Sequence, residues 1–191
     1  GGFEAAGIEF VQTTGSGNSI TGNSIGIGAD GSSNIAGTGG LGEAGILVTG
    51  YSFDTFDVMI GGTGAGEGNR VGHSANDAVR VSNRDGVIIT GNTITDSDEA
   101  GIALQNNSEA AIYANLIYNN TGIGIDLDRN DVTINDDDDS DDGANERLNF
   151  PVLNSLATDG STTITYDFNL DVPTNAQGYR VDFYRNSVAH S

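Results

Sequence analysis

The side chains best placed to do chemistry lie in one acidic stretch, DLDRNDVTINDDDDSDDGANE, from Asp126 to Glu146. Carboxylates this close together repel one another, and a bound divalent cation relieves that repulsion. From Asp126 and again from Asp138, oxygen-bearing side chains stand at the first, third and fifth positions, as in a calcium loop. Gly143 even fills a sixth position, but Asn149 stands where an EF-hand carries its bidentate Glu.

The acidic stretch therefore predicts a calcium site that is not an EF-hand. A disordered acidic linker is the alternative interpretation. The expected ligands are Asp126, Asp128, Asn130, Asp136, Asp138 and Asp142.

Arg80, Asp126 and Asp128 suggest a second chemistry, the cleavage of a glycosidic bond. Two carboxylates on one strand, two residues apart, lie about 7 Å from each other, within the range for an inverting glycosidase. If Arg80 lies two stacked strands away from Asp126, the separation is about 10 Å. The surrounding segments are the shortest in the chain, however, and short loops form poor clefts. An enzyme is therefore the less favoured interpretation.

The elements that would position these residues repeat along the chain. Segments with the same pattern begin at Gly7, Gly45, Ala78, Gly101 and Gly124, with spacings of 38, 33, 23 and 23 residues. A fixed period in the twenties indicates a solenoid. Because the repeats carry β-branched runs broken by Gly, Asn and Asp, the prediction is all-β: a parallel β-helix of about five coils.

Alternation within each repeat predicts which side chains face inward. The expected inward pairs are Ile8 with Phe10, Ile46 with Val48, Val79 with Val81, Ile102 with Leu104, and Ile125 with Leu127. The expected outward column is Glu9, Leu47, Arg80, Ala103 and Asp126. Two segments read as insertions, Ala29 to Glu43 and the aromatic-rich Tyr51 to Ile60.

One asparagine recurs at a fixed place in each repeat. Asparagine tolerates the left-handed geometry of a tight corner, and stacked amides can hydrogen-bond from coil to coil. We therefore predict a structural asparagine ladder instead of a binding site. Its members are Asn23, Asn69, Asn92 and Asn115.

The C-terminal part changes pattern. Thr162 to Leu170 and Tyr179 to Tyr184 alternate as antiparallel strands around a proline-containing turn. Two strands cannot bury a sandwich core, so we expect only part of a β-sandwich. The predicted domains are a β-helix over 1–127, an acidic connector over 128–153 and a partial sandwich over 154–191.

Composition limits the partners. The net charge is −20, and all 7 basic residues are arginines. Nucleic acids and anionic membranes bind basic patches, so neither is expected as a partner, and no apolar run is long enough for membrane insertion.

Several runs resemble a known family: IGGTGAGEGNRVGHS (Ile60 to Ser74), the GNTI repeat, GIDLDRNDVTINDDDDSDDGANERLNFPVL (Gly124 to Leu153) and the later YRVDFYRNS. They are similar to large secreted bacterial and archaeal proteins with right-handed parallel β-helix repeats, of the pectate-lyase-like superfamily, followed by an Ig-like sandwich. The resemblance implies a secreted or cell-surface location and an adhesive, surface-layer or filament role. The partners expected are other copies of the chain or a surface glycan, with calcium as a stabilising ion. The alternative it implies is a polysaccharide lyase or glycoside hydrolase acting on an acidic polysaccharide. In the lyase, calcium-bound carboxylates would lie beside an Arg base.

Overall fold

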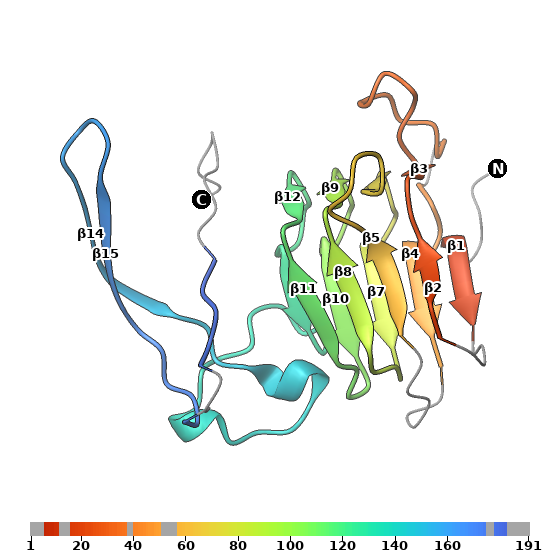
Figure 1. The fold of residues 1–191 in the computed structure, drawn as a ribbon. Coiled ribbons are helices and arrows are strands. Elements are labelled where there is room, and N and C mark those ends of the chain that lie inside the picture. The colour runs from red at the N-terminus through yellow and green to blue at the C-terminus, as the bar shows by residue number, and fades with distance from the viewer. Residues whose placement is uncertain (1–5, 12–15, 38–39, 51–56, 175–177, 183–191) are drawn as a thin grey trace.

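The computed structural model describes residues 6–11, 16–37, 40–50, 57–174 and 178–182. It contains a stack of coils, each built from three short strands, followed by a connector and a two-stranded hairpin (Figure 1). The fold prediction is confirmed: the chain is a parallel β-helix with an antiparallel pair at its C-terminal end.

Three parallel sheets run along the solenoid, and each takes one strand from every coil. Sheet A contains β1 (Ala6–Val11), β4 (Ala44–Thr49), β7 (Asp77–Ser82), β10 (Ile102–Gln105) and β13 (Ile125–Leu127). Sheet B contains β2 (Asn18–Ile20), β5 (Val58–Gly61), β8 (Val87–Thr90) and β11 (Ala110–Tyr113). Sheet C contains β3 (Ser24–Ile25), β6 (Arg70–Gly72), β9 (Thr93–Thr95) and β12 (Leu116–Tyr118). The described residues thus form four three-stranded coils, and β13 opens a fifth.

The register of sheet A follows the apolar pairs in the sequence. Ile46 pairs with Ile8 on one side and with Val79 on the other, and Ile102 joins Val79 to Ile125. Ile46, Val79 and Ile102 are completely buried. Burying each such side chain contributes roughly 1.5 to 3 kcal/mol, so this column is a main source of the stability of the coils.

The four recurring asparagines are connected by hydrogen bonds along the solenoid. The side-chain amide of Asn23 donates to Asn69 Oδ1 at 3.0 Å, that of Asn69 to Asn92 Oδ1 at 2.9 Å, and that of Asn92 to Asn115 Oδ1 at 2.9 Å. Each acceptor oxygen also takes the backbone N–H of the preceding asparagine. The column therefore satisfies buried polar groups that strand pairing leaves open at the corner.

The prediction that Tyr51 to Ile60 is an insertion is partly wrong. Val58 and Ile60, at the end of Tyr51 to Ile60, lie in β5 and are completely buried. They pair with Val87 and Ile89 of the next coil, so this part belongs to the repeat. The aromatic residues Tyr51, Phe53 and Phe56 lie outside the described residues.

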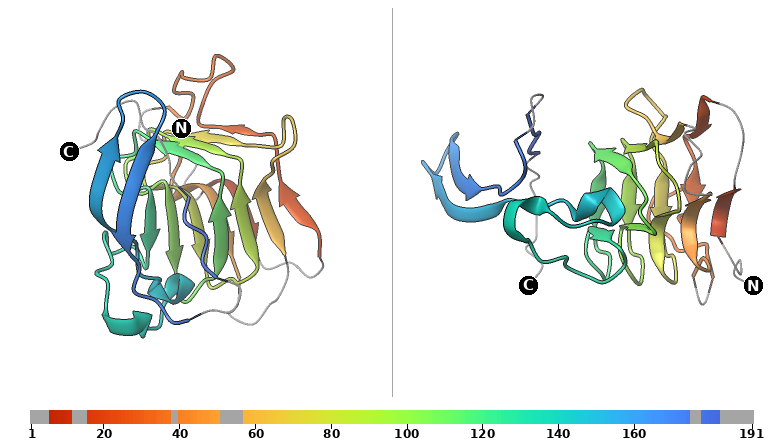
Figure 2. Two further views of the ribbon diagram at one scale, coloured as in Figure 1. Left: turned by 60° about the vertical axis from the view of Figure 1, so that its left-hand side comes forward. Right: turned by 90° about the horizontal axis from the view of Figure 1, so that it is seen from below.

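The C-terminal strands also differ from the prediction. Thr162 to Leu170 contains β15 (Ile164–Asn169), but β15 pairs with β14 (Val152–Thr158), a strand the pattern did not predict. In the predicted strand Tyr179 to Tyr184, the described residues 179–182 form no strand. The hairpin lies beyond the last coil, with the connector between them (Figure 2).

Candidate functional site

Two groups of polar side chains are candidates for function: the outer face of sheet A and the acidic connector. The connector holds two short turns of 3-10 helix, η1 (Asp137–Asp139) and η2 (Ala144–Arg147). Several of their residues, including Asp138 and Asn145, have positive φ angles of 61° and 47°. Asp and Asn tolerate that geometry better than most residues, which explains the local composition.

On the outer face of sheet A, Arg80 is tied into a buried ion-pair network. Its Nε lies 2.8 Å from Asp77 Oδ2, and its guanidinium also donates to the carbonyl of Glu43 at 2.8 Å. Arg129, from the turn after β13, reaches the same Asp77 oxygen at 3.0 Å. Because Arg129 belongs to the fifth coil and Asp77 to the third, this contact bridges the outer face across Ala103 of the fourth.

Asp126 is buried on the same outer face, opposite Ala103 in the pairing of β10 with β13. Its two oxygens accept the backbone N–H groups of Asn130 at 3.1 Å and Asp131 at 3.3 Å. Burial raises the pKa of the Asp126 carboxyl, because the two N–H bonds do not fully replace water and the charges of Asp131 and Asp77 add repulsion. Asp126 thus closes the turn after β13.

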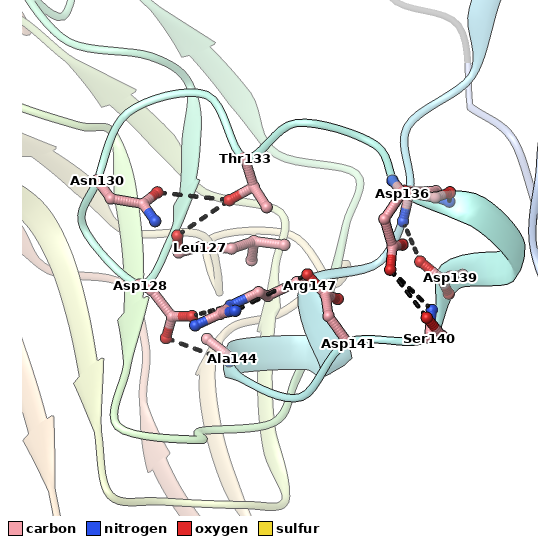
Figure 3. A network of polar contacts seen from close by, with 11 residues as sticks. Leu127, Asp128, Asn130, Thr133, Asp136, Asp139, Ser140, Asp141, Ala144 and Arg147 are labelled. Carbon is pink, nitrogen blue, oxygen red and sulfur yellow. Dashed lines mark hydrogen bonds and ion pairs between the residues drawn. The ribbon is translucent and has the colours of Figure 1, made fainter.

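Asp128 makes different contacts from Asp126, although the two are only two residues apart. Its Oδ2 lies 2.6 Å from Arg147 Nε, and its Oδ1 accepts the Ala144 N–H at 3.2 Å (Figure 3). The hydrogen bond and charge of Asp128 raise the pKa of the Arg147 guanidinium. Asp128 has a φ of 69°, so the strand alternation that would place both carboxylates on one face ends before it.

Gly143 allows this contact to form. Its φ is 148°, and a Cβ at this position would lie 2.6 Å from both Arg147 Nε and Asp128 Oδ2. The glycine that the sequence pattern suggested as the sixth position of a calcium loop therefore has a packing reason of its own in this structure.

The connector is fastened to the last coil through η2. Ala144 is completely buried among the core residues of the solenoid. The Asn145 side chain accepts the Ala110 N–H at 2.7 Å and donates to the Ala110 carbonyl at 3.0 Å, so it occupies the place of a neighbouring strand. Its backbone N–H donates to the Ser108 carbonyl at 2.9 Å.

Among the remaining carboxylates of the connector, Asp136, Asp139 and Asp141 make local contacts. Asp136 Oδ2 accepts the N–H of Ser140 at 3.2 Å and the Ser140 hydroxyl at 3.0 Å (Figure 3). Asp139 Oδ1 accepts the Asn149 N–H at 2.6 Å. Asp141 lies 3.8 Å from Arg147 through one oxygen, whereas its buried Oδ1 has no hydrogen-bond partner within the described structure.

Of the six residues expected to bind calcium, Asp126, Asp128, Asn130 and Asp136 make local contacts, whereas Asp138 and Asp142 are exposed. Among the residues that the structure describes, no three His, Asp or Glu side chains gather closely enough to hold a metal ion. The calcium site therefore stays a prediction. Similarly, Arg80, Asp126 and Asp128 each have separate partners: Asp77 and Glu43 for Arg80, backbone N–H groups for Asp126, and Arg147 for Asp128.

Comparison with known proteins identifies the solenoid. Residues 6–137 match the family model of the right-handed β-helix region, a span covering well over half of the 191 residues. The chain belongs to the right-handed β-helix family. No curated protein and no solved structure matches it.

The matched region of this right-handed β-helix ends at residue 137, inside the acidic connector. It therefore includes all of sheet A and the turn that carries Asp126, Asp128 and Arg129. Within the described residues, no helix is both long enough and apolar enough to cross a membrane.

Sequence patterns did not reveal the partners of these residues. Strand alternation places residues three apart on opposite faces, so nothing predicted that Asp77 and Arg80 would pair. Asn145 lies in the acidic stretch and Arg147 directly follows it, and the density of carboxylates drew attention to metal ligands instead. The only available signal was that Arg129 lies within, and Arg147 next to, a stretch of many acids.

Proposed function

We propose that this β-helix is a structural module of a secreted or cell-surface protein, with an adhesive, surface-layer or filament role. The observation that carries the proposal is that its candidate catalytic side chains are engaged in contacts within the fold. Arg80, Asp126 and Asp128, the residues suited to polysaccharide cleavage, form ion pairs and turn contacts that hold the fold. The family match supports a β-helix module, but it does not favour the adhesive, the surface-layer or the filament role over the other two.

A turnover assay tests the structural role. The folded protein would be incubated with polygalacturonate and with alginate in calcium buffer, while unsaturated products and new reducing ends are measured. We expect no turnover by the protein or by its Asp126→Asn variant. Turnover that disappears in Asp126→Asn would overturn the proposal in favour of a lyase or hydrolase. The raised pKa of Asp126 is the feature that favours that alternative, because a protonated carboxyl can act as a general acid.

We further propose that calcium stabilises the acidic connector. Six aspartates lie between Asp136 and Asp142, and only Arg147 pairs with this group among the cations of the described residues. The buried Asp141 Oδ1 without a hydrogen-bond partner supports a bound cation, since a buried carboxylate oxygen requires compensation. Asp141 was not among the ligands predicted from the sequence.

Calcium titration of thermal unfolding tests this second proposal. We expect the Tm to rise with calcium and to fall when the calcium is chelated, at constant ionic strength. Asp138→Asn/Asp142→Asn should reduce the calcium response, whereas Asp167→Asn, in the hairpin, should leave it unchanged. A Tm that is the same with calcium and with chelator would contradict the proposal. Mg²⁺ at the same concentration separates specific binding from screening of the −20 net charge.

A further inference from the structure

Two stretches of the chain match Asn-x-Ser/Thr, the acceptor motif for N-linked glycosylation. One begins at Asn106 and the other at Asn119. Because so short a motif recurs by chance, the surroundings of each asparagine decide whether the folded protein presents it to an enzyme.

The motif at Asn106 is engaged in the fold. The Asn106 side-chain amide donates to Ser82 Oγ at 3.0 Å. Ser108, the third residue of the motif, is completely buried. Its hydroxyl donates to the Gln105 carbonyl at 2.6 Å and accepts the Arg84 N–H at 3.2 Å. An enzyme that needs both the amide and the hydroxyl therefore has to open this coil first.

The motif at Asn119, in the turn after β12, is presented to solvent. Asn119 and Thr121 are both exposed. Among the residues that the structure describes, none hydrogen-bonds to the Asn119 side chain. The Thr121 N–H donates to the Ser97 carbonyl at 2.9 Å, and Asn119 has a φ of 57°. The backbone of the turn is thus held in place while the acceptor amide is available.

Exposed apolar side chains lie directly beside Asn119. On the outer face of β12, Leu116 and Tyr118 are 51% and 36% exposed. In the preceding coil, Thr93 and Thr95 occupy the paired positions. The apolar surface therefore appears in the coil that also carries the available motif, and exposed apolar surface of this kind marks a place that a ligand or partner covers. Pyranose rings have an apolar C–H face that packs against aromatic side chains, so a glycan at Asn119 suits this surface.

We propose that Asn119 is a site of N-linked glycosylation and that its glycan covers Leu116 and Tyr118. The donor is an oligosaccharide joined through pyrophosphate to a polyprenol lipid. The Asn119 amide nitrogen forms a bond to the anomeric carbon of the first sugar, and the bond from that carbon to the pyrophosphate oxygen breaks. The lipid pyrophosphate leaves, and a base of the transferring enzyme takes the amide proton. The proposal rests on the secreted or cell-surface location proposed above, because this modification is made on exported proteins.

Glycosylation of the folded protein in vitro tests the site. The protein would be incubated with a purified oligosaccharyltransferase and a lipid-linked oligosaccharide, and intact mass and peptide mapping would follow. We expect one glycan per chain, at Asn119. Asn119→Gln and Thr121→Val should each lose the added mass completely, whereas Asn106→Gln should retain it. A synthetic peptide, LIYNNTGIG, is the positive control for the enzyme.

Tyrosine nitration by tetranitromethane tests the covering. Tyr118 and Tyr166 are 36% and 38% exposed, so they form a matched pair. In the glycosylated protein, Tyr118 should lose most of the nitration that it shows without the glycan, whereas Tyr166 should retain its own. Unchanged nitration of Tyr118 would contradict the proposed covering.

Two further results would overturn the proposal. One is modification of the peptide but not of Asn119 in a protein that circular dichroism shows to be folded. The other is modification of Asn106 to the same extent as Asn119 in that folded protein. Because the reaction is carried out in vitro, either result counts against the site and not against the secreted location.

Discussion

Asparagine at the corner of each coil satisfies backbone groups that belong to its neighbours. Asn92 is 1% exposed, and its amide donates to the carbonyls of Ile60 and Thr90 as well as to Asn115. Its oxygen accepts from Asn69 through both the backbone and the side chain. An asparagine in the interior of the ladder therefore contributes more to the stability of the fold than one at its end, since it has partners on both sides.

Asn92→Ala should destabilise the protein by about 3 kcal/mol or more, because each buried group left without a partner costs roughly 1 to 3 kcal/mol. Urea unfolding measures the change. Asn23→Ala, at the more exposed end of the ladder, is the control and should cost less than half as much. Similar losses at both positions would mean that the ladder does not act through buried backbone groups.

The Asp126 carboxyl should affect stability with pH in a direction opposite to that of a salt-bridged aspartate. Burial raises its pKa in the folded protein, so the native state binds this proton more tightly than the unfolded state. The native state thus gains stability as pH falls from above the raised pKa to below the usual aspartate pKa of 3.8. In Asp126→Asn that gain is absent. We expect the free energy of unfolding of the wild type, relative to that of Asp126→Asn, to increase as pH is lowered from 7 toward 3 in urea unfolding. A decrease relative to the variant would contradict this.

Gly143→Ala should break the contact between Asp128 and Arg147, because the added Cβ would lie 2.6 Å from atoms of both. We expect a loss of about 1 to 3 kcal/mol. The backbone itself also disfavours alanine here, because Gly143 has φ 148° and ψ −159°. The packing effect is therefore measured by repeating Gly143→Ala in an Asp128→Ala background, where the backbone cost remains but the contacted carboxylate is gone. A smaller Tm decrease in that background is expected. Equal decreases in the two backgrounds would remove the proposed packing role of Gly143.

Among the elements, the strands of sheet A followed from their sequence most directly. Residues such as Val79 and Ile102 alternate with outward side chains, and a one-residue slip would bury the charge of Arg80 in the core, so only one register is possible. β5 was missed because its Val58 and Ile60 follow an aromatic-rich run that looked like an insertion.

β14 was missed for a different reason. Leu153 and Leu156 are three residues apart, which breaks the alternation expected of a strand. A bulge between Leu153 and Ser155 restores the pairing, so that Leu153 faces Phe168 and Leu156 faces Tyr166. The contacts of the connector were equally hidden, since a single sequence does not show that Asn145 can replace a strand at Ala110.

The parallel strands make a direct test of the core possible. Ile102→Asp places a charge in a completely buried position between Val79 and Ile125, and we expect the solenoid to be unfolded at 25 °C. Ala111→Asp is the control, because Ala111 lies on the exposed face of β11 and should change stability by less than about 1 kcal/mol. Circular dichroism and thermal melting distinguish the two. A folded Ile102→Asp with normal melting would show that this column is not the core.

On the scale of the whole molecule, the charged residues of the outer face bind distant coils together. The Arg129–Asp77 ion pair connects the fifth coil to the third. Arg80, also in the third coil, forms an ion pair with Glu43, which lies just before the first strand of the second coil. The connector then fixes the last coil through Asn145 and the buried Ala144. The side chains considered for catalysis thus connect separate coils and turns of the β-helix.

The stability of Arg80→Met tests this structural account most directly. Removing one partner of a buried ion pair costs most when it leaves an uncompensated charge. Arg129 still pairs with Asp77 in Arg80→Met, so we expect a smaller loss, of about 1 to 3 kcal/mol, in urea unfolding. Residues kept for catalysis behave differently, because replacing them commonly leaves stability unchanged or raises it. A measured loss of about 1 to 3 kcal/mol, with no polysaccharide turnover before or after the substitution, is the predicted result. An unchanged or higher stability, together with the loss of a polysaccharide-cleaving activity, would contradict the account.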